Sequence, residues 1–282
     1  MAAIVGQSGA WQIIASDLAQ RGYPVSSPRE LRPLLTSIEK NRPQLINANR
    51  ERTMRSVQEL TRQVSSLAAE RGFFRRLINW FRIRAVRNEI AAIHRADSQY
   101  SSALDQAIVH LRSLLSSAEL AGAEAELAVI DRLRTLPSSV VVFNDVRLKA
   151  TRYIRFNGIA LISAQIDHVV LTPAGVFVVE TKRWSQRFVD SGDFHNPFDQ
   201  VSRANYLCYD LLRRSFGKTR VRSVIACDGS LPDATRESYI KVVRPENLTS
   251  YILGFRNAEL SPERLNELHG FFEYRVGNPN AI

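Results

Sequence analysis

Two neighbouring apolar segments that carry three charged residues constrain the fold of this chain more than any other feature. Residues 165–171 contain Asp167, and residues 176–182, which follow a Pro-Ala-Gly turn, contain Glu180 and Lys182. The apolar content of both segments predicts two β-strands that are buried on both faces. Because an unpaired charge in such strands costs several kcal/mol, these side chains should have one another, or a cation, as partners.

The turn between the two segments sets which residues face each other. If Pro173-Ala174 is a two-residue hairpin loop, Asp167 lies opposite Glu180, and Lys182 shares the face of Glu180. A type I turn followed by a G1 bulge is the alternative, and it would move the pairing by one residue.

The composition is that of a globular protein. The chain has 282 residues, of which 45% are hydrophobic and 23% are charged, enough for one ordinary domain and an appendage. Cys208 and Cys227 are far apart in the sequence, which argues against a disulfide framework or a zinc site and favours a reducing cytoplasm. We expect neither a signal peptide nor a transmembrane helix, because the sequence lacks a basic leader and a long uncharged apolar run.

The positive charge is concentrated in the N-terminal third. The net charge is +10, and residues 1–118 hold 17 Arg and Lys against 9 Asp and Glu. Such a balance favours polyanionic partners, such as nucleic acid or an anionic membrane surface.

Residues 1–118 are predicted to form a helical arm that begins at Ser27-Pro28 and is interrupted at Pro43. Two heptad stripes separated by a short segment around residues 71–72 predict an antiparallel helical hairpin, roughly 40 Å long at about 1.5 Å per residue. A parallel dimer is the alternative. The first stripe contains Ile46, Val57, Leu60, Val64 and Leu67, and the second runs from Val86 to Ala118 with Asp97 as its one polar interruption.

The expected tip of this arm, residues 71–84, is rich in aromatic residues and arginine and contains no acid. Its apolar side chains are first expected to cap the core of the hairpin: Phe73, Phe74, Leu77 and Phe81. The alternatives are contact with a protein partner or a second copy of the chain, contact with nucleic acid, and, least favoured, docking on a membrane.

From residue 119 the pattern is that of an α/β domain. A helix, several strands, a helix starting at Asn196-Pro197 and ending at Gly217, and two further strands predict a mixed sheet covered by helices on both faces. We expect this domain to span residues 119–256. Residues 257–282 are predicted to add a C-terminal helix that packs on it.

Two further polar residues are predicted to face the acidic strands. Glu126 and Gln200 each lie on the apolar stripe of their helix. A buried cluster of these residues is typical of a cation site, because Mg²⁺ binds carboxylate, carbonyl and water oxygens and activates a bound water. Asp167, Glu180 and the backbone carbonyl of Thr181 are the expected metal ligands, with Lys182 next to the attacking water.

Residues immediately after the second strand are candidates for nucleic-acid contact. Arg183, Trp184 and Arg187 could stack on bases or hold phosphates, and the alternative is a solvated loop that covers the sheet edge. Gly6-Gln7-Ser8-Gly9 has part of the pattern of a nucleophile elbow, but no strand is expected before it, so it is given no role.

Several of these motifs, taken in order, resemble the nuclease-related domain (NERD), a family placed in the PD-(D/E)xK nuclease superfamily. They are Gly122-Ala123-Glu124-Ala125-Glu126, Asn144-Asp145-Val146, residues 165–170, residues 175–182 and Asn196-Pro197-Phe198-Asp199-Gln200. The resemblance covers roughly residues 119–256, with Ala125 where the family usually has a second glycine.

The resemblance implies the PD-(D/E)xK α/β core and a nuclease that hydrolyses DNA with Mg²⁺ or Mn²⁺. By analogy with the superfamily, it also suggests restriction of foreign DNA, as in antiviral defence. The alternatives are a binding module that keeps the fold without turnover and a scaffold that acts through its arm.

Overall fold

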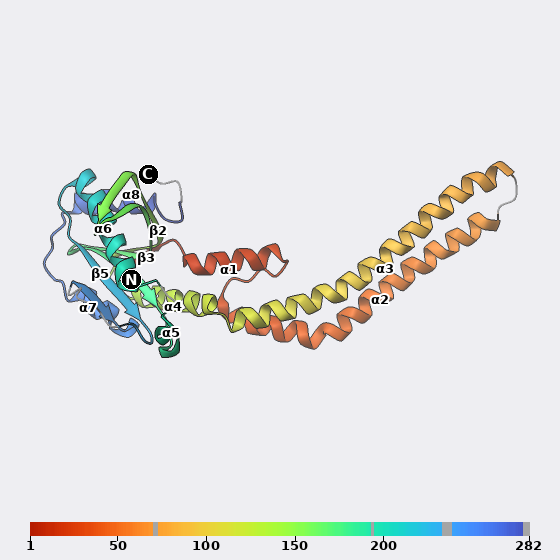
Figure 1. Cartoon of the computed structure of the whole chain (residues 1–282), viewed down its shortest axis with the longest axis horizontal. Coiled ribbons are helices and arrows are strands. Elements are labelled where there is room, and N and C mark those ends of the chain that lie inside the picture. Colours follow the sequence, from red (N-terminus) through yellow and green to blue (C-terminus); the bar gives the residue numbers. More distant parts are fainter. Residues whose placement is uncertain (70–72, 193–194, 233–238, 279–282) are drawn as a thin grey trace. The chain divides into compact units, whose positions relative to one another are not determined.

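The chain divides into two compact units (Figure 1). The structure, a computed structural model, describes residues 1–69, 73–192, 195–232 and 239–278, without the side chains of residues 73–77. One unit combines residues 1–28 with residues 118–282, and the other, the arm unit, comprises Arg29–Ser117. The arm is therefore shorter at its N-terminal end than the predicted range of 1–118.

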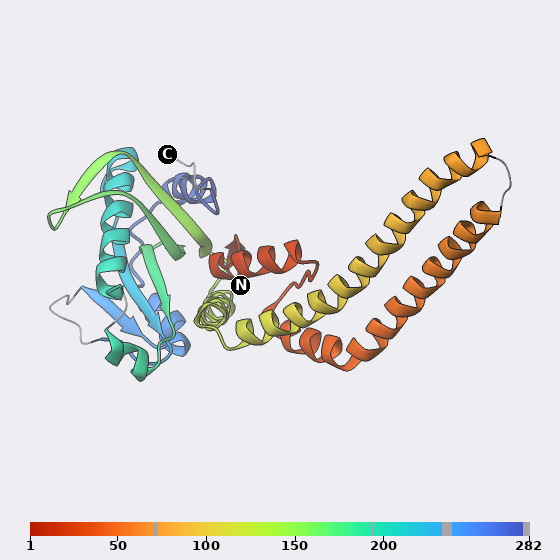
Figure 2. The same cartoon turned by 45° about the vertical axis from the view of Figure 1, so that its right-hand side comes forward.

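The arm unit is an antiparallel helical hairpin. Helices α2 (Leu31–Ala69) and α3 (Phe73–Leu115) lie side by side in Figures 1 and 2. Arg42 pairs with Asp105 at 2.7 Å, while Asn49, further along α2, contacts Asp97, which is earlier in α3. This order confirms the antiparallel arrangement. The expected interruption at Pro43 is wrong, because α2 continues through this proline, which removes only one helical hydrogen bond.

A polar pair explains the break in the second heptad stripe. Asn49 Nδ2 donates a hydrogen bond of 2.6 Å to Asp97 Oδ1, so the inward carboxylate is satisfied by the facing helix. A polar pair of this kind fixes the register of two helices, because any slip would leave it unpaired.

The other unit is built on a six-stranded mixed sheet in the order β1-β2-β3-β4-β5-β6. Strands β2, β3 and β4 are antiparallel neighbours, β1 is parallel to β2, and β5 and β6 continue the sheet parallel to β4. The strands are β1 (Ala3–Val5), β2 (Val141–Phe156), β3 (Ile159–Thr172), β4 (Gly175–Lys182), β5 (Val221–Cys227) and β6 (Ile240–Val243).

Helices cover both faces of this sheet, which confirms the predicted α/β class. Helices α6 (Pro197–Phe216) and α8 (Pro262–Glu273) pack on one face, where Val201, Leu207 and Phe272 are fully buried. Helices α4 (Ala118–Leu133) and α7 (Pro245–Leu253) pack on the other, with Val129 and Leu248 in the core. The short helix α5 (Gln186–Ser191) follows β4, and the bounds of α6 agree with the predicted Asn196 cap and Gly217 stop.

The N-terminal residues differ from the prediction of an entirely helical third. They form β1 and then α1 (Gly9–Gln20), which packs against α4. A strand therefore does precede Ser8, contrary to expectation. The sequence signal was weak because β1 has only three residues.

Strands β2 and β3 form one long hairpin around Asn157-Gly158, whose φ angles are 48° and 78°. Two positive φ angles in succession are typical of a type I′ turn, for which Asn-Gly is the preferred sequence. A register shift between Lys149 and Ile154 interrupts the ladder. Figure 2 shows the end of this hairpin curling beside α6, where Phe156 stacks on Tyr206 with ring centroids 4.7 Å apart.

The β3–β4 connection is the two-residue hairpin. Thr172 pairs with Gly175 and His168 pairs with Val179, so the ladder has the register that places Asp167 opposite Glu180. The alternative with a G1 bulge is therefore excluded. No described helix is both long and apolar enough to cross a membrane.

Candidate active site

The candidate site begins where β3 and β4 separate. The printed ladder ends at His168 and Val179, immediately before Asp167 and Glu180. Beyond this point the backbone N–H of Thr181 donates to Asp167 Oδ2 at 2.7 Å instead of to a strand carbonyl. Because the N–H and C=O of one residue in a strand point to the same side, the Thr181 carbonyl faces the side of Asp167 as well.

Glu180 and Lys182 form a buried ion pair at the end of β4. Lys182 Nζ lies 2.5 Å from Glu180 Oε1, and the two side chains are 14% and 2% exposed. Both residues share the strand face of Val178, as the period of two requires. The ammonium of Lys182 is thus held beside the carboxylate of Glu180.

Glu126 is held by the N-terminal segment. Ser8 Oγ donates to Glu126 Oε2 at 2.7 Å, and the Ala10 N–H approaches the same oxygen at 3.5 Å. Ser8 is almost completely buried and also caps α1 by accepting a hydrogen bond from the Trp11 N–H. Sequence reasoning missed this role of Ser8, since 118 residues separate it from Glu126.

The carboxylates are close enough to affect one another. Burial, reinforced by the charge of Asp167, raises the pKa of Glu180 to about 8 and that of Glu126 to about 7. Burial also raises the pKa of Asp167, against the influence of Lys182. Burial alone would lower the pKa of Lys182, but the charges of Glu180 and Asp167 outweigh it and raise that pKa. If all three acids were ionised, they would carry more negative charge than the one ammonium of Lys182 balances, and the raised pKa values express this imbalance.

A fourth carboxylate, Asp145, was not predicted as a site residue. It is 2% exposed, accepts a hydrogen bond of 2.6 Å from Gln165 Nε2, and lies 3.4 Å from Arg147. Its charge raises the pKa of both Glu126 and Asp167. An aspartate inside the buried strand β2 is the same signal that singled out Asp167, so the sequence could have indicated it.

His168 lies next to Asp167 in the sequence but has a structural role. It is fully buried, with Nδ1 2.8 Å from Asn144 Oδ1 and Nε2 3.1 Å from Thr181 Oγ1. Since Asn144 Oδ1 can only accept, Nδ1 carries the proton and Nε2 accepts from the threonine hydroxyl. Burial lowers the pKa of His168 to about 3, so the ring is neutral.

The other predicted residues lie around this cluster. Gln200 is half-buried in the first turn of α6, and no described contact joins its side chain to the acids. Arg183 is exposed and lies 3.2 Å from Glu124, Trp184 packs edge-on against Phe188, and Arg187 is exposed on α5. A cavity of about 220 Å³ beside β4 is lined by Glu124, Ala125, Ala128, Arg132, Thr181, Lys182, Arg183, Asp228, Pro245 and Glu246.

The carboxylate oxygens of Asp167 and Glu180 suit an ion such as Mg²⁺ that keeps several water ligands, but they do not surround an ion completely. Among the described residues, no group of three or more His, Cys, Asp or Glu side chains is arranged to hold a metal. Mg²⁺ commonly uses only one or two carboxylates and keeps several waters. The described hydrogen bonds engage Oδ2 of Asp167 and Oε1 of Glu180, which leaves the second oxygen of each for an ion.

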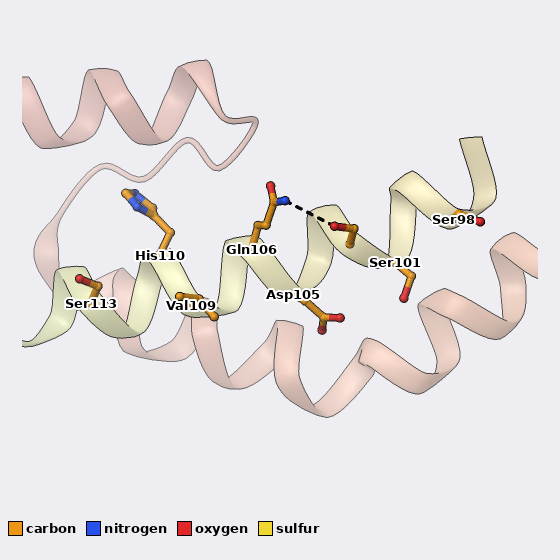
Figure 3. A pocket seen from close by; sticks show the side chains of 8 residues that line it. Ser98, Ser101, Asp105, Gln106, Val109, His110 and Ser113 are labelled. Carbon is orange, nitrogen blue, oxygen red and sulfur yellow. Dashed lines mark hydrogen bonds between the residues drawn. The ribbon is translucent and has the colours of Figure 1, made fainter. Parts of the chain in front are cut away.

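A second hollow, of about 770 Å³, runs along α3 in the arm unit (Figure 3). Its lining is a polar helix face in which Gln106 donates to Ser102 and Asp105 is already paired with Arg42. It contains none of the clustered acids, so it is not the candidate active site.

Three comparisons with known proteins bear on this unit. The search of curated proteins found no match. Among solved structures, the crystal structure of protein VC1899 from Vibrio cholerae matches with 12% identity and a TM-score of 0.31. That alignment covers 90% of this chain and 59% of the other, and at this score it carries no argument. The family model described as nuclease-related domain matches residues 121–227. This range contains Glu126, Asp167, Glu180 and Lys182, and the match confirms the predicted resemblance to the nuclease-related domain over residues 121–227.

Proposed function

We propose that this chain hydrolyses phosphodiester bonds of DNA with Mg²⁺ or Mn²⁺. The observation that carries the proposal is the group formed by the buried Glu180 and the partly buried Glu126 and Asp167 near the ammonium of Lys182, inside the matched nuclease-related domain. Acids that raise one another's pKa disfavour their ionised forms, and a bound cation would offset this cost. A purely structural ion pair between Glu180 and Lys182 would not require the other two acids.

Each residue has a role in this proposal. Asp167, Glu180 and the carbonyl of Thr181 would hold the ion, which lowers the pKa of a bound water and offsets charge on the phosphate. Lys182 would orient the attacking water and stabilise negative charge that develops at phosphorus. Glu126, held by Ser8, completes the acidic wall.

The substrate contacts are proposed at the exit of β4. Arg183 and Arg187 are exposed, and Trp184 lies with its ring 5.8 Å from Lys182 Nζ, so phosphate and base contacts would form beside the ammonium. Gln200 lies at the start of α6 and would support this edge of the site. Restriction of foreign DNA is the biological role that such an activity would suit.

A cleavage panel tests the proposal. The intact chain would be incubated with supercoiled plasmid, linear duplex, single-stranded DNA and RNA in the presence of Mg²⁺, Mn²⁺ or EDTA. We expect cleavage of DNA with either ion and none with EDTA. Binding of DNA without cleavage under every metal condition would instead support the alternative of a binding module without turnover.

A further inference from the structure

We propose that the arm unit docks on an anionic lipid surface through a tip patch made of Ile78, Trp80, Phe81, Arg82 and Arg84. This proposal is independent of the nuclease activity, because it concerns only α3 and its charges.

The tip patch faces solvent. Ile78, Trp80 and Phe81 are 54%, 53% and 63% exposed, and Trp80 and Phe81 pack edge to face. The opposite side of the same turn faces α2, because Asn79 is buried and its Nδ2 donates to the Leu67 carbonyl at 2.8 Å.

The expectation that aromatic side chains cap the core of the hairpin is therefore wrong for Phe81. The side chains of Phe73, Phe74 and Leu77 lie outside the described residues.

The charge around the tip patch has one sign. The segment between Glu70 and Glu89 contains six arginines and no acid. Arg84 lies over the ring of Trp80 at 5.6 Å, and no described ion pair involves Arg82 or Arg84.

Elsewhere the arm unit is nearly balanced in charge, with 10 Arg and Lys against 8 Asp and Glu in residues 29–70 and 89–117. Arg42 pairs with Asp105, and Arg112 lies 2.6 Å from Glu39. The excess of arginine in the sequence between Glu70 and Glu89 therefore indicates the tip as the part of the arm that suits an anionic partner.

An anionic lipid surface accounts for both the exposed apolar side chains and the arginines of the tip patch. Tryptophan and phenylalanine prefer the boundary between headgroups and acyl chains, and nearby arginines are attracted to anionic headgroups. Nucleic acid would account for the arginines and for stacking on Trp80, but it offers little to an exposed isoleucine.

Vesicle sedimentation of the full chain tests the proposal. We expect binding to vesicles of phosphatidylcholine with phosphatidylserine, little binding to phosphatidylcholine alone, and weaker binding at high salt. The double variant Trp80→Ala/Phe81→Ala should reduce binding by roughly tenfold or more. The control Met54→Ala/Val109→Ala removes side chains of the same arm that are 62% and 65% exposed, and it should bind as the wild type does.

A second measurement uses the indole of Trp80. The fluorescence of the wild type should shift to shorter wavelength on anionic vesicles, and Trp80→Phe should abolish most of this shift. The proposal would be overturned if the wild type bound neutral vesicles as well as anionic ones, or bound neither. It would also be overturned if the tip variant and the control variant lost vesicle binding equally. A tip variant that alters only oligonucleotide binding or the subunit count measured by light scattering would overturn it as well.

Discussion

At the scale of single residues, the site depends on carboxylates that lie together, buried or partly buried, near only one ammonium group among the described residues. Glu180 has Lys182 as its partner, Asp167 has the Thr181 N–H, and Glu126 has Ser8. Each partner satisfies part of one acid, but these contacts do not offset the cost of ionising all three acids together. These partners determine what substitutions should do.

The burial of Glu180 makes stability depend on pH. Because its pKa is raised from 4.5 to about 8, the folded chain binds more protons than the unfolded chain between these values, and stability falls as the pH rises through this window. As the pH rises from 6 to 9, the free energy of unfolding of Glu180→Gln should increase relative to that of the wild type by on the order of 2 kcal/mol. Thermal melts over this range measure the difference.

Two controls accompany these melts. Glu124→Gln changes a carboxylate that is 46% exposed and should follow the wild-type pH profile. Mn²⁺ should raise the melting temperature of the wild type most at high pH, where the acids are ionised. If the stability of Glu180→Gln and that of the wild type changed with pH in the same way, folding would not raise the pKa of Glu180. That result would contradict this prediction.

Ser8 should be a positioning residue for Glu126. Ser8→Ala removes both the cap of α1 and the donor to Glu126, so it should cost about 1–2 kcal/mol and also lower the cleavage rate. Ser261→Ala is the matched control, because Ser261 caps α8 in the same way and makes no described contact with the acids. This role would be contradicted if Ser8→Ala and Ser261→Ala lowered the cleavage rate equally. It would also be contradicted if Ser8→Thr restored stability but not the cleavage rate.

At the scale of elements, the β3–β4 hairpin brings the chemistry together. Its two-residue loop fixes the register, and its strands separate where the acidic residues begin. This part of the site could be predicted, because all of its residues lie within one short stretch of sequence. The contact of Ser8 with Glu126 could not, since it depends on β1 and α1 pairing with distant elements.

Glycine substitutions in two elements should have opposite effects. Gly175 has a φ of 121°, and an added Cβ would lie 2.8 Å from the Arg220 carbonyl oxygen, so Gly175→Ala should destabilise the chain by about 2 kcal/mol or more. Gly122 lies inside α4 with no atom near its Cβ position, so Gly122→Ala should stabilise by about 0.5–1 kcal/mol. Urea denaturation compares the two variants, and changes of the same sign would contradict the account of the hairpin.

At the scale of the whole molecule, the chain joins a nuclease-related unit to a helical arm. The family match spans residues 121–227, yet the nuclease-related unit also uses residues 1–28, which supply β1 and the support of Glu126. The heptad pattern predicted the hairpin well, because periodicity reports which side chains face inward. The heptad pattern was not used to predict that Trp80 and Phe81 face solvent. If the stripe of inward-facing residues that begins at Val86 is continued towards the start of α3, it does not include these two residues.

The central claim is that the acids and Lys182 form one metal-dependent cleavage site. Plasmid nicking with Mn²⁺ by the wild type, Asp167→Asn, Lys182→Ala and the exposed control Lys218→Ala tests it most directly. We predict nicking by the wild type and Lys218→Ala, and at least about a hundredfold lower rates for Asp167→Asn and Lys182→Ala, with unchanged DNA binding. Nicking by folded Asp167→Asn and Lys182→Ala at the wild-type rate would contradict the claim.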